Sequence, residues 1–156
     1  MQLSKIEVDK QQREIIKYEN GDFPFLIFTD DFCNFDEGYI RWHWHKYLQI
    51  SYVVEDKICF QVNGETIVLN PGEGILFNSN VLHQLKPYYQ NCKMISIMFN
   101  QSIISGSDHS LISKKYVDTL INSHNLDFVI FKNDVNWQSE ILQYVKDIYS
   151  SYKNKD

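Results

Sequence analysis

The sequence has few residues that cross-link a fold or interrupt its helices and strands: three cysteines, three prolines and six glycines in 156 residues. Cys33, Cys59 and Cys92 are odd in number and include no Cys-x-x-Cys pair, which argues against a disulfide framework and a thiolate zinc site. No run of eighteen apolar residues occurs, so no membrane span is predicted. The polar first residues lack the apolar middle of a secretion signal. We therefore expect a reduced, cytoplasmic protein.

Positive charge is also scarce, because 15 Lys and Arg residues stand against 20 Asp and Glu residues, a net charge of -5. Proteins that bind nucleic acid directly present a basic face. We therefore do not expect this chain to contact DNA by itself. Apolar residues make up 44% of the chain and aromatic residues 15%. A chain of this length buries about 70% of its unfolded surface, so the composition predicts one domain with a real core.

The residue patterns divide the chain into three zones. Residues 1–22 form a polar arm, residues 23–108 are rich in strand signals, and residues 109–156 turn helical. No internal repeat or low-complexity run interrupts them.

The strand zone is marked by turn signals. Asn63-Gly64 separates two apolar runs, Ile58–Val62 and Glu65–Leu69, and this dipeptide is the strongest short signal of a β-hairpin. Asn70-Pro71-Gly72 marks the next turn. Further strands are expected at Phe23–Phe28, Tyr39–Val54, Gly74–Phe77 and Lys93–Phe99. Short strands with turns every eight to twelve residues predict an all-β sandwich or barrel.

The last zone predicts a short helix at Ser113–Asn122, an extended segment at Asp127–Phe131 and a longer amphipathic helix. The apolar residues of that helix recur at Trp137, Ile141, Val145, Ile148 and Tyr152. A helix with so wide an apolar stripe needs something to lie against. Two interpretations stay open: the helix packs only on its own barrel, or it also packs on a partner chain and makes a homodimer.

The stretch from Arg41 to Gln49 carries the candidate chemistry. Because side chains alternate across a strand, one face presents polar groups and the other is apolar or aromatic. The polar face holds His43, His45, Tyr47, Gln49 and Ser51. A third imidazole, His83, returns on a later segment. Two histidines two residues apart, with a third from another strand, suit a divalent metal ion.

These motifs resemble the two motifs of the cupin superfamily, and more closely the N-terminal sensor domain of AraC-type bacterial transcription regulators. The resemblance rests on His43-x-His45-x-x-x-Gln49, on Asn63-Gly64 and Asn70-Pro71-Gly72-Glu73, and on Asn78-x-Asn80-x-x-His83, and it covers residues 18–153. It implies a mainly β fold, a cupin-type jelly-roll barrel followed by C-terminal α-helices.

The chain departs from the metal-binding cupin pattern at three positions. Gln49 stands where that pattern has Glu, Asp56 where it has Gly, and Ser79 where it has Pro. A neutral amide is a weaker ligand than a carboxylate and leaves more charge on a bound cation. We therefore expect no cofactor, with a divalent metal on the three histidines as the alternative.

Three interpretations of the histidines compete. They are buried residues that simply hydrogen-bond to neighbours, or metal ligands, or part of a pocket for a small organic effector. The pocket interpretation assigns five side chains to hydrogen bonds with a small polar molecule such as a sugar: His43, His45, Tyr47, Gln49 and His83.

The resemblance implies a non-enzymatic, effector-sensing and dimerising domain. In AraC-type regulators the barrel precedes two helix-turn-helix units, and no such pattern is seen before the sequence stops at Asp156. DNA would be contacted only through that missing C-terminal part. The arm could close over the barrel mouth and bury the ligand. The alternative function is a small metal-dependent cupin enzyme, a dioxygenase or isomerase.

Overall fold

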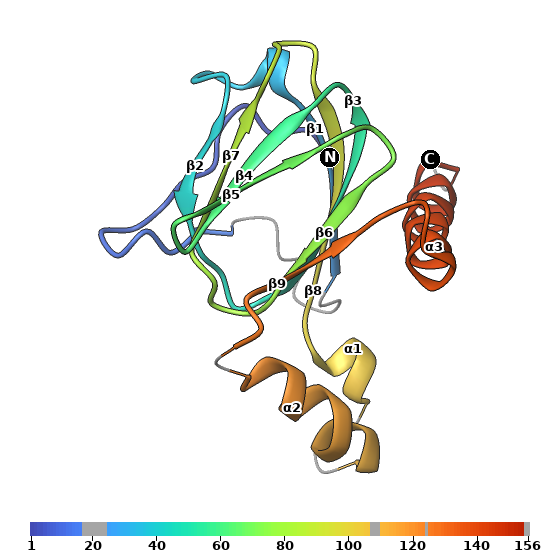
Figure 1. Ribbon diagram of the computed structural model, residues 1–156. Coiled ribbons are helices and arrows are strands. Elements are labelled where there is room, and N and C mark those ends of the chain that lie inside the picture. Colours follow the sequence, from blue (N-terminus) through green and yellow to red (C-terminus); the bar gives the residue numbers. More distant parts are fainter. Residues whose placement is uncertain (17–24, 107–109, 124, 155–156) are drawn as a thin grey trace.

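The computed structural model describes residues 1–16, 25–106, 110–123 and 125–154. Two antiparallel sheets face each other, as Figure 1 shows. The five-stranded sheet has the order β1 (Phe25–Asp31), β8 (Lys93–Phe99), β3 (Leu48–Glu55), β6 (Gly74–Phe77) and β9 (Phe128–Phe131). The four-stranded sheet has the order β2 (Ile40–His43), β7 (His83–Pro87), β4 (Ile58–Val62) and β5 (Glu65–Leu69).

The first eight strands form nested antiparallel pairs: β1 with β8, β2 with β7, β3 with β6 and β4 with β5. This nesting across two facing sheets is the jelly-roll arrangement. The innermost pair turns at Asn63-Gly64, where both residues have positive φ, as the sequence predicts. The predicted fold class is therefore confirmed: a mainly β chain with helices toward its C-terminus.

One predicted strand is wrong. The segment Tyr39–Val54 contains no glycine or proline and was expected to run as a single strand, but it is divided into β2 and β3, which belong to opposite sheets. The chain turns the corner between residues 44 and 47. There Trp44 pairs through its backbone with the arm, donating to Gln12 O and accepting from Glu14 N. A long-range partner stabilises this corner, so no local signal marks it.

The inward and outward sides of the five-stranded sheet have different partners. Inward side chains such as Phe28, Met94 and Phe77 meet the four-stranded sheet in the main core between the sheets. Outward side chains such as Ile50 and Ile97 form a second cluster under the C-terminal helix. The apolar face of β3 therefore packs outward, and its polar face points into the barrel.

The C-terminal helix, α3 (Asn136–Lys153), lies against the outer face of the five-stranded sheet (Figure 1). Leu142 and Val145 are buried there, and Tyr149 Oη lies 2.9 Å from Thr29 Oγ1. The adjacent side of the helix stays exposed and carries Trp137, Tyr144, Ile148 and Tyr152, although the Trp137 ring also meets Phe131 edge-on at 6.1 Å. Val145, one of the residues expected to contact a partner chain, thus packs against the chain's own barrel.

Three short helical segments follow β8 at one end of the barrel (Figure 1): α1 (Ser102–Ser105), the π-helical turn η2 (Ser113–Val117) and α2 (Asp118–Ile121). Asn78 holds this group to the barrel, because its side-chain amide donates to the carbonyl oxygens of Leu120 and Leu126, each at 2.9 Å. The predicted helix at Ser113–Asn122 is thus a π turn that continues into α2.

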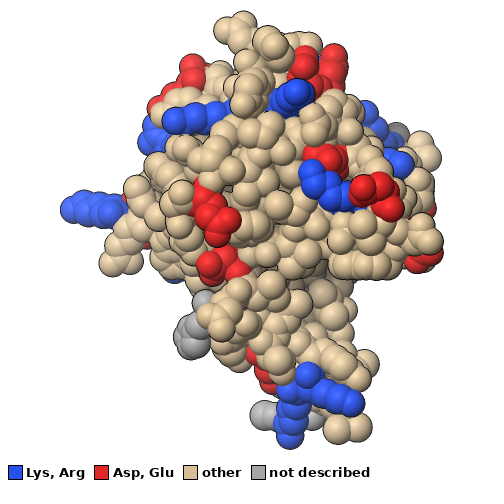
Figure 2. Space-filling view, in the orientation of Figure 1, with Lys and Arg blue, Asp and Glu red and all other residues tan. Residues whose placement is uncertain are grey.

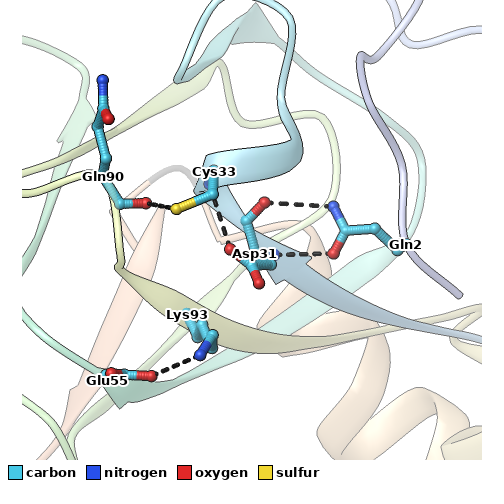
Figure 3. Close-up of polar contacts among 6 residues, drawn as sticks. All are labelled: Gln2, Asp31, Cys33, Glu55, Gln90 and Lys93. Atoms are coloured by element: carbon cyan, nitrogen blue, oxygen red, sulfur yellow. Dashed lines mark hydrogen bonds and ion pairs between the residues drawn. The ribbon is translucent and has the colours of Figure 1, made fainter.

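The N-terminal arm connects the free edges of the two sheets. Its start lies along β1, where Thr29 N donates to Met1 O at 2.7 Å and the side chain of Gln2 bonds to both backbone groups of Asp31 (Figure 3). Its later part pairs with the corner at Trp44. Figure 3 also shows that a 3-10 turn, η1 (Phe32–Asn34), follows β1. The arm thus closes the seam of the barrel between β1 and β2.

The described helices include none long and apolar enough to cross a membrane. Figure 2 shows acidic and basic side chains interspersed over one face of the molecule, without a continuous basic field on that face. This agrees with the acidic balance of the sequence.

The close approach of α3 to the sheet generates a stability prediction. A Cβ placed on Gly74 would lie 2.8 Å from Leu142 Cδ2 and 2.8 Å from the backbone oxygen of Ser51. We therefore expect Gly74→Ala to lower the free energy of unfolding by about 1–3 kcal/mol. Urea denaturation measures the free energy of unfolding, with Thr66→Ala on exposed β5 as the control. A Gly74→Ala variant as stable as the wild type would show that α3 does not pack this closely.

Candidate functional site

The three predicted histidines converge inside the barrel. His43 and His83 are direct partners in the pairing of β2 with β7, and their ring centroids lie 4.2 Å apart. His45 lies in the corner after β2, with its ring 5.5 Å from that of His83. Phe77, from the facing sheet, stacks on His83 at 4.2 Å. We call His43, His45 and His83 the imidazole cluster; all are at most 3% exposed.

Each imidazole is oriented by the backbone. Its Nδ1 lies 2.8–3.0 Å from a carbonyl oxygen: His43 on Arg41, His45 on Tyr47, and His83 on Val81. A carbonyl oxygen only accepts, so each Nδ1 carries the ring proton and each Nε2 keeps its lone pair. His83 Nε2 is fully buried and has no hydrogen-bond partner among the described residues. A buried, unsatisfied acceptor is rare, and it is open to a donor from a water molecule or a ligand, or to a cation.

Burial keeps the cluster neutral. Desolvation, with the neighbouring His45, lowers the pKa of His43 to about 3. Desolvation also lowers the pKa of His45, and it lowers that of His83 well below the ordinary value, with both other histidines adding to the effect. The site therefore presents lone pairs, not positive charges, at neutral pH.

A buried chain of polar contacts leads away from His45. His45 Nε2 lies 2.8 Å from Gln49 Oε1, and the Gln49 amide nitrogen donates to Ser51 Oγ at 3.0 Å. Ser51 Oγ lies 3.2 Å from Ser96 Oγ, which donates to Asp30 Oδ2 at 2.9 Å. The chain crosses β3, β8 and β1 on the inward side of one sheet. Its five members, His45 to Asp30, are all at most 4% exposed.

The arm fills most of the remaining interior. A cavity between His43, Gln49 and Asp30 has only about 30 Å³ of free volume, room for one or two waters. The arm's Leu3 and Glu14 line it. Burial, together with the charge of Asp30, raises the pKa of Glu14 to about 7. On the outside, a pocket of about 300 Å³ borders His45, Tyr47 and Glu14.

The structure brings four of the five predicted pocket residues together: the imidazole cluster and Gln49. Tyr47 is buried at the corner, with its ring 6.4 Å from that of His45, and borders the outer pocket. Sequence reasoning missed Asp30, Ser96 and Glu14. Ser96 is a polar residue within the apolar run Lys93–Phe99, which was a usable signal, whereas Asp30 follows the expected strand Phe23–Phe28 and had no such signal. Glu14 had none, because only the path of the arm places it inside.

The donor set fits a divalent metal ion. Each member of the imidazole cluster offers a nitrogen, and these atoms all lie within 4.8 Å of one another. Neutral imidazole is a common ligand of zinc, iron, nickel and copper. The unsatisfied Nε2 of His83 supports this fit. A bound ion would supply Lewis acidity at the cluster.

The middle of the chain matches a known family. Residues 34–98 match the family model of the cupin domain, which spans β2 to β8. This match and the two facing sheets together support a cupin domain in this part of the chain.

A longer protein is similar over almost the whole chain. It is an uncharacterized HTH-type transcriptional regulator of Bacillus subtilis, YdeC, 24% identical over 149 residues. The alignment covers 95% of this chain and 50% of the relative, so the chain spans about half the length of that protein.

Solved structures of other proteins align with parts of this chain. A cupin-2 domain protein from Shewanella frigidimarina is 22% identical with a TM-score of 0.40, covering 53% of this chain and 74% of that one. KdgF from Halomonas is 23% identical with a TM-score of 0.36, covering 38% and 56%. A predicted oxalate decarboxylase from Thermotoga maritima is 16% identical with a TM-score of 0.38, covering 40% and 56%.

The neutral state of the cluster predicts how stability depends on pH. Because the pKa of His43 is lowered in the folded protein, His43 takes up a proton in the unfolded chain at a higher pH than in the folded one. The stability that neutral His43 contributes is therefore complete above pH 6.5 and is lost as pH falls toward about 3. In metal-free protein, His43→Gln should reduce the slope of unfolding free energy against pH by up to ~1.4 kcal/mol per pH unit in this window.

Denaturant titrations at several pH values, with chelator present, measure the slope. Thr66→Ala, far from the cluster on exposed β5, should keep the wild-type slope. If His43→Gln gives the same slope as wild type, His43 is not held neutral by burial.

Proposed function

We propose that this chain is the sensing and dimerising part of an AraC-type transcription regulator. In this proposal it binds a small polar effector at the imidazole cluster and does not catalyse a reaction. DNA is contacted only by a separate helix-turn-helix domain of the full regulator.

The observation that carries the proposal is the extent of the similarity to the HTH-type regulator. The aligned 149 residues go beyond the cupin match at both ends and take in the arm and α3. A catalytic barrel alone would need neither. Arm, barrel and helix are the parts that a sensor needs to couple a ligand to a partner chain.

The chemistry of the site supports a donor-rich effector. The cluster presents the Nε2 atoms of His43 and His83, and that of His83 is fully buried without a hydrogen-bond partner among the described residues. A polyhydroxylated molecule such as a sugar can donate to both, and buried hydrogen bonds of this kind discriminate strongly against ligands without them.

The arm must move for such a ligand to bind. About 30 Å³ is too small for a sugar while Leu3 and Glu14 occupy the interior. Pockets of about 470 and 620 Å³, partly open to solvent, border residues 4–8 and 14–16 of the arm. An effector that binds in the interior displaces the arm. It shifts the equilibrium between the two arm positions only to the extent that its affinity for them differs.

The exposed side of α3 supports homodimerisation. Helical geometry puts Trp137, Tyr144, Ile148 and Tyr152 on one face, beside the face that packs on the sheet, and all are more than 40% exposed. A continuous apolar and aromatic strip of this kind is typical of an interface.

A substitution in this strip tests the dimer. Ile148→Glu should weaken self-association at least tenfold, because it buries a charge in the interface. Light scattering over a dilution series measures the mass. Ser150→Glu, an exposed position on the same helix outside the strip, should leave association unchanged. A monomeric wild type at high micromolar concentration would contradict the proposal.

A reporter assay tests the sensing role. Residues 1–156 are fused to a DNA-binding domain that represses its operator only as a dimer. The wild-type fusion should repress, Ile148→Glu should relieve repression, and Ser150→Glu should not. A small-molecule library then supplies the effector, whose response should be lost with His83→Ala. Equal repression by all three fusions would contradict the dimer role of the strip. If no compound in the library changes repression, that result counts against a sensing role.

A metal-dependent cupin enzyme is the second candidate, favoured by the unsatisfied Nε2 of His83 within a metal-like donor set. It predicts turnover of an organic substrate by metal-loaded protein. The small closed interior does not separate the two candidates, since a substrate and an effector both need the arm to move.

A further inference from the structure

The short helical segments after β8 bury polar side chains and expose apolar ones. We call residues 102–105 and 110–121, which include α1, η2 and α2, the helical lobe. Its buried residues are two serines, Ser105 and Ser113, and one apolar residue, Val117. Its large apolar side chains include five that are 45–84% exposed: Ile103, Ile104, Leu111, Ile112 and Tyr116. So many exposed apolar groups on one small element are typical of a surface that another molecule covers.

The helical lobe is also basic. Lys114 and Lys115 are exposed, and they are the only lysine or arginine residues between positions 100 and 131. Lys115 Nζ lies over the ring of Tyr116, 5.2 Å from its centroid. In Figure 2, basic side chains gather at the lower end of the molecule, where Figure 1 places the lobe. The lobe therefore fits a partner that is apolar with an acidic edge.

The exposed strip of α3 has such an edge. At about 100° per residue, Glu140 and Asp147 lie along the side of the strip that is further from the barrel. Both are exposed, and neither forms an ion pair with a described residue. Lys146 and Lys153 lie on the other side of the helix, each over a tyrosine ring. The strip and its edge thus match the lobe in both apolar character and charge.

Within one chain, the two surfaces do not meet. The helix α3 lies at the side of the barrel, whereas the lobe lies beyond one end of it (Figure 1). The side-chain amide of Asn78 ties the lobe to that end through the carbonyl oxygens of Leu120 and Leu126. The strip that covers a lobe must therefore come from another molecule.

Two α3 helices match each other less well. In an antiparallel pair related by a two-fold axis, like edges of the two helices meet. Glu140 would then approach Asp147 of the partner subunit, and like charges that face each other are destabilising. The lysines of the lobe offer the opposite charge to the same acidic edge.

We propose that the helical lobe is the docking surface for α3 of a second copy of this chain. The contact is reciprocal, with Lys114 and Lys115 of each lobe against Glu140 and Asp147 of the other chain's helix, so a two-fold dimer contains it twice. A standard interface buries about 1,600 Å², so each contact needs to bury only about half of that area. The inference rests on the proposed dimerisation and identifies the surface that the strip meets.

Charge reversal on both surfaces tests the proposal. The lobe variant combines Lys114→Glu with Lys115→Glu, and the helix variant combines Glu140→Lys with Asp147→Lys. Each places like charges in both contacts, so each should raise the dimer dissociation constant about tenfold or more. Analytical ultracentrifugation over a dilution series measures this constant.

Combining the two sets of substitutions provides the rescue. A chain with all four should associate to within about threefold of the wild type, because every contact again joins opposite charges. An equimolar mixture of the lobe variant and the helix variant should form heterodimers more tightly than either forms homodimers. In such a heterodimer one contact keeps the original charges and the other has both reversed. Recovery of association also shows that the substituted chains fold.

The matched control is Lys57→Glu with Lys86→Glu. These exposed lysines lie at the Ile58–Pro87 end of the β4–β7 pair, opposite the His83 end that leads to Asn78 and the lobe. The control should associate like the wild type.

Three results would overturn the proposal, and they separate it from dimerisation itself. If the lobe variant associates like the wild type while Ile148→Glu disrupts the dimer, the dimer stands and the strip meets another surface. If the helix variant binds wild-type chain more tightly than wild type binds itself, α3 pairs with α3. A wild type that stays monomeric at high micromolar concentration contradicts both the docking surface and the proposed dimer.

Discussion

The backbone carbonyls of Arg41, Tyr47 and Val81 each accept a hydrogen bond from the Nδ1 of one buried imidazole, and the rest of the site depends on these three bonds. They fix the proton on one ring nitrogen and leave the other as an acceptor. Burial then prevents a second proton from binding. A cluster of neutral acceptors follows.

The jelly-roll topology brings these rings together. Because β2 pairs with β7 in register, His43 and His83 meet although forty residues separate them. The corner after β2 then turns His45 toward both. The same corner transfers the chain to the facing sheet, where Gln49 begins the path to Asp30. One bend of the backbone therefore builds the cluster and connects it to its supporting chain.

Much of this could be predicted from the sequence, for identifiable reasons. Alternation along residues 43–51 correctly places the polar side chains inside, and Asn63-Gly64 correctly marks a hairpin, because both signals are local. The corner at residues 44–47 could not be predicted, since the arm stabilises it from thirty residues away. Asp30 could not be assigned for the same reason: its partner Ser96 is adjacent only through the pairing of β1 with β8.

The arm limits access to the cluster. It closes the seam between the sheets and places Glu14 and Leu3 against the cavity that the cluster borders. Whatever binds at the cluster must therefore act on the arm or pass beside it, through the outer pocket at His45 and Tyr47. Occupancy of the site and the position of the arm are coupled by shared space.

The most direct test of the central claim is nitrogen-15 NMR of the histidine side chains in metal-free protein, recorded from pH 8 down to pH 5. The account predicts that His43, His45 and His83 all remain neutral over this range, each with its proton on Nδ1. Protonation of any of the three near pH 6.5, or a ring with its proton on Nε2, would contradict it.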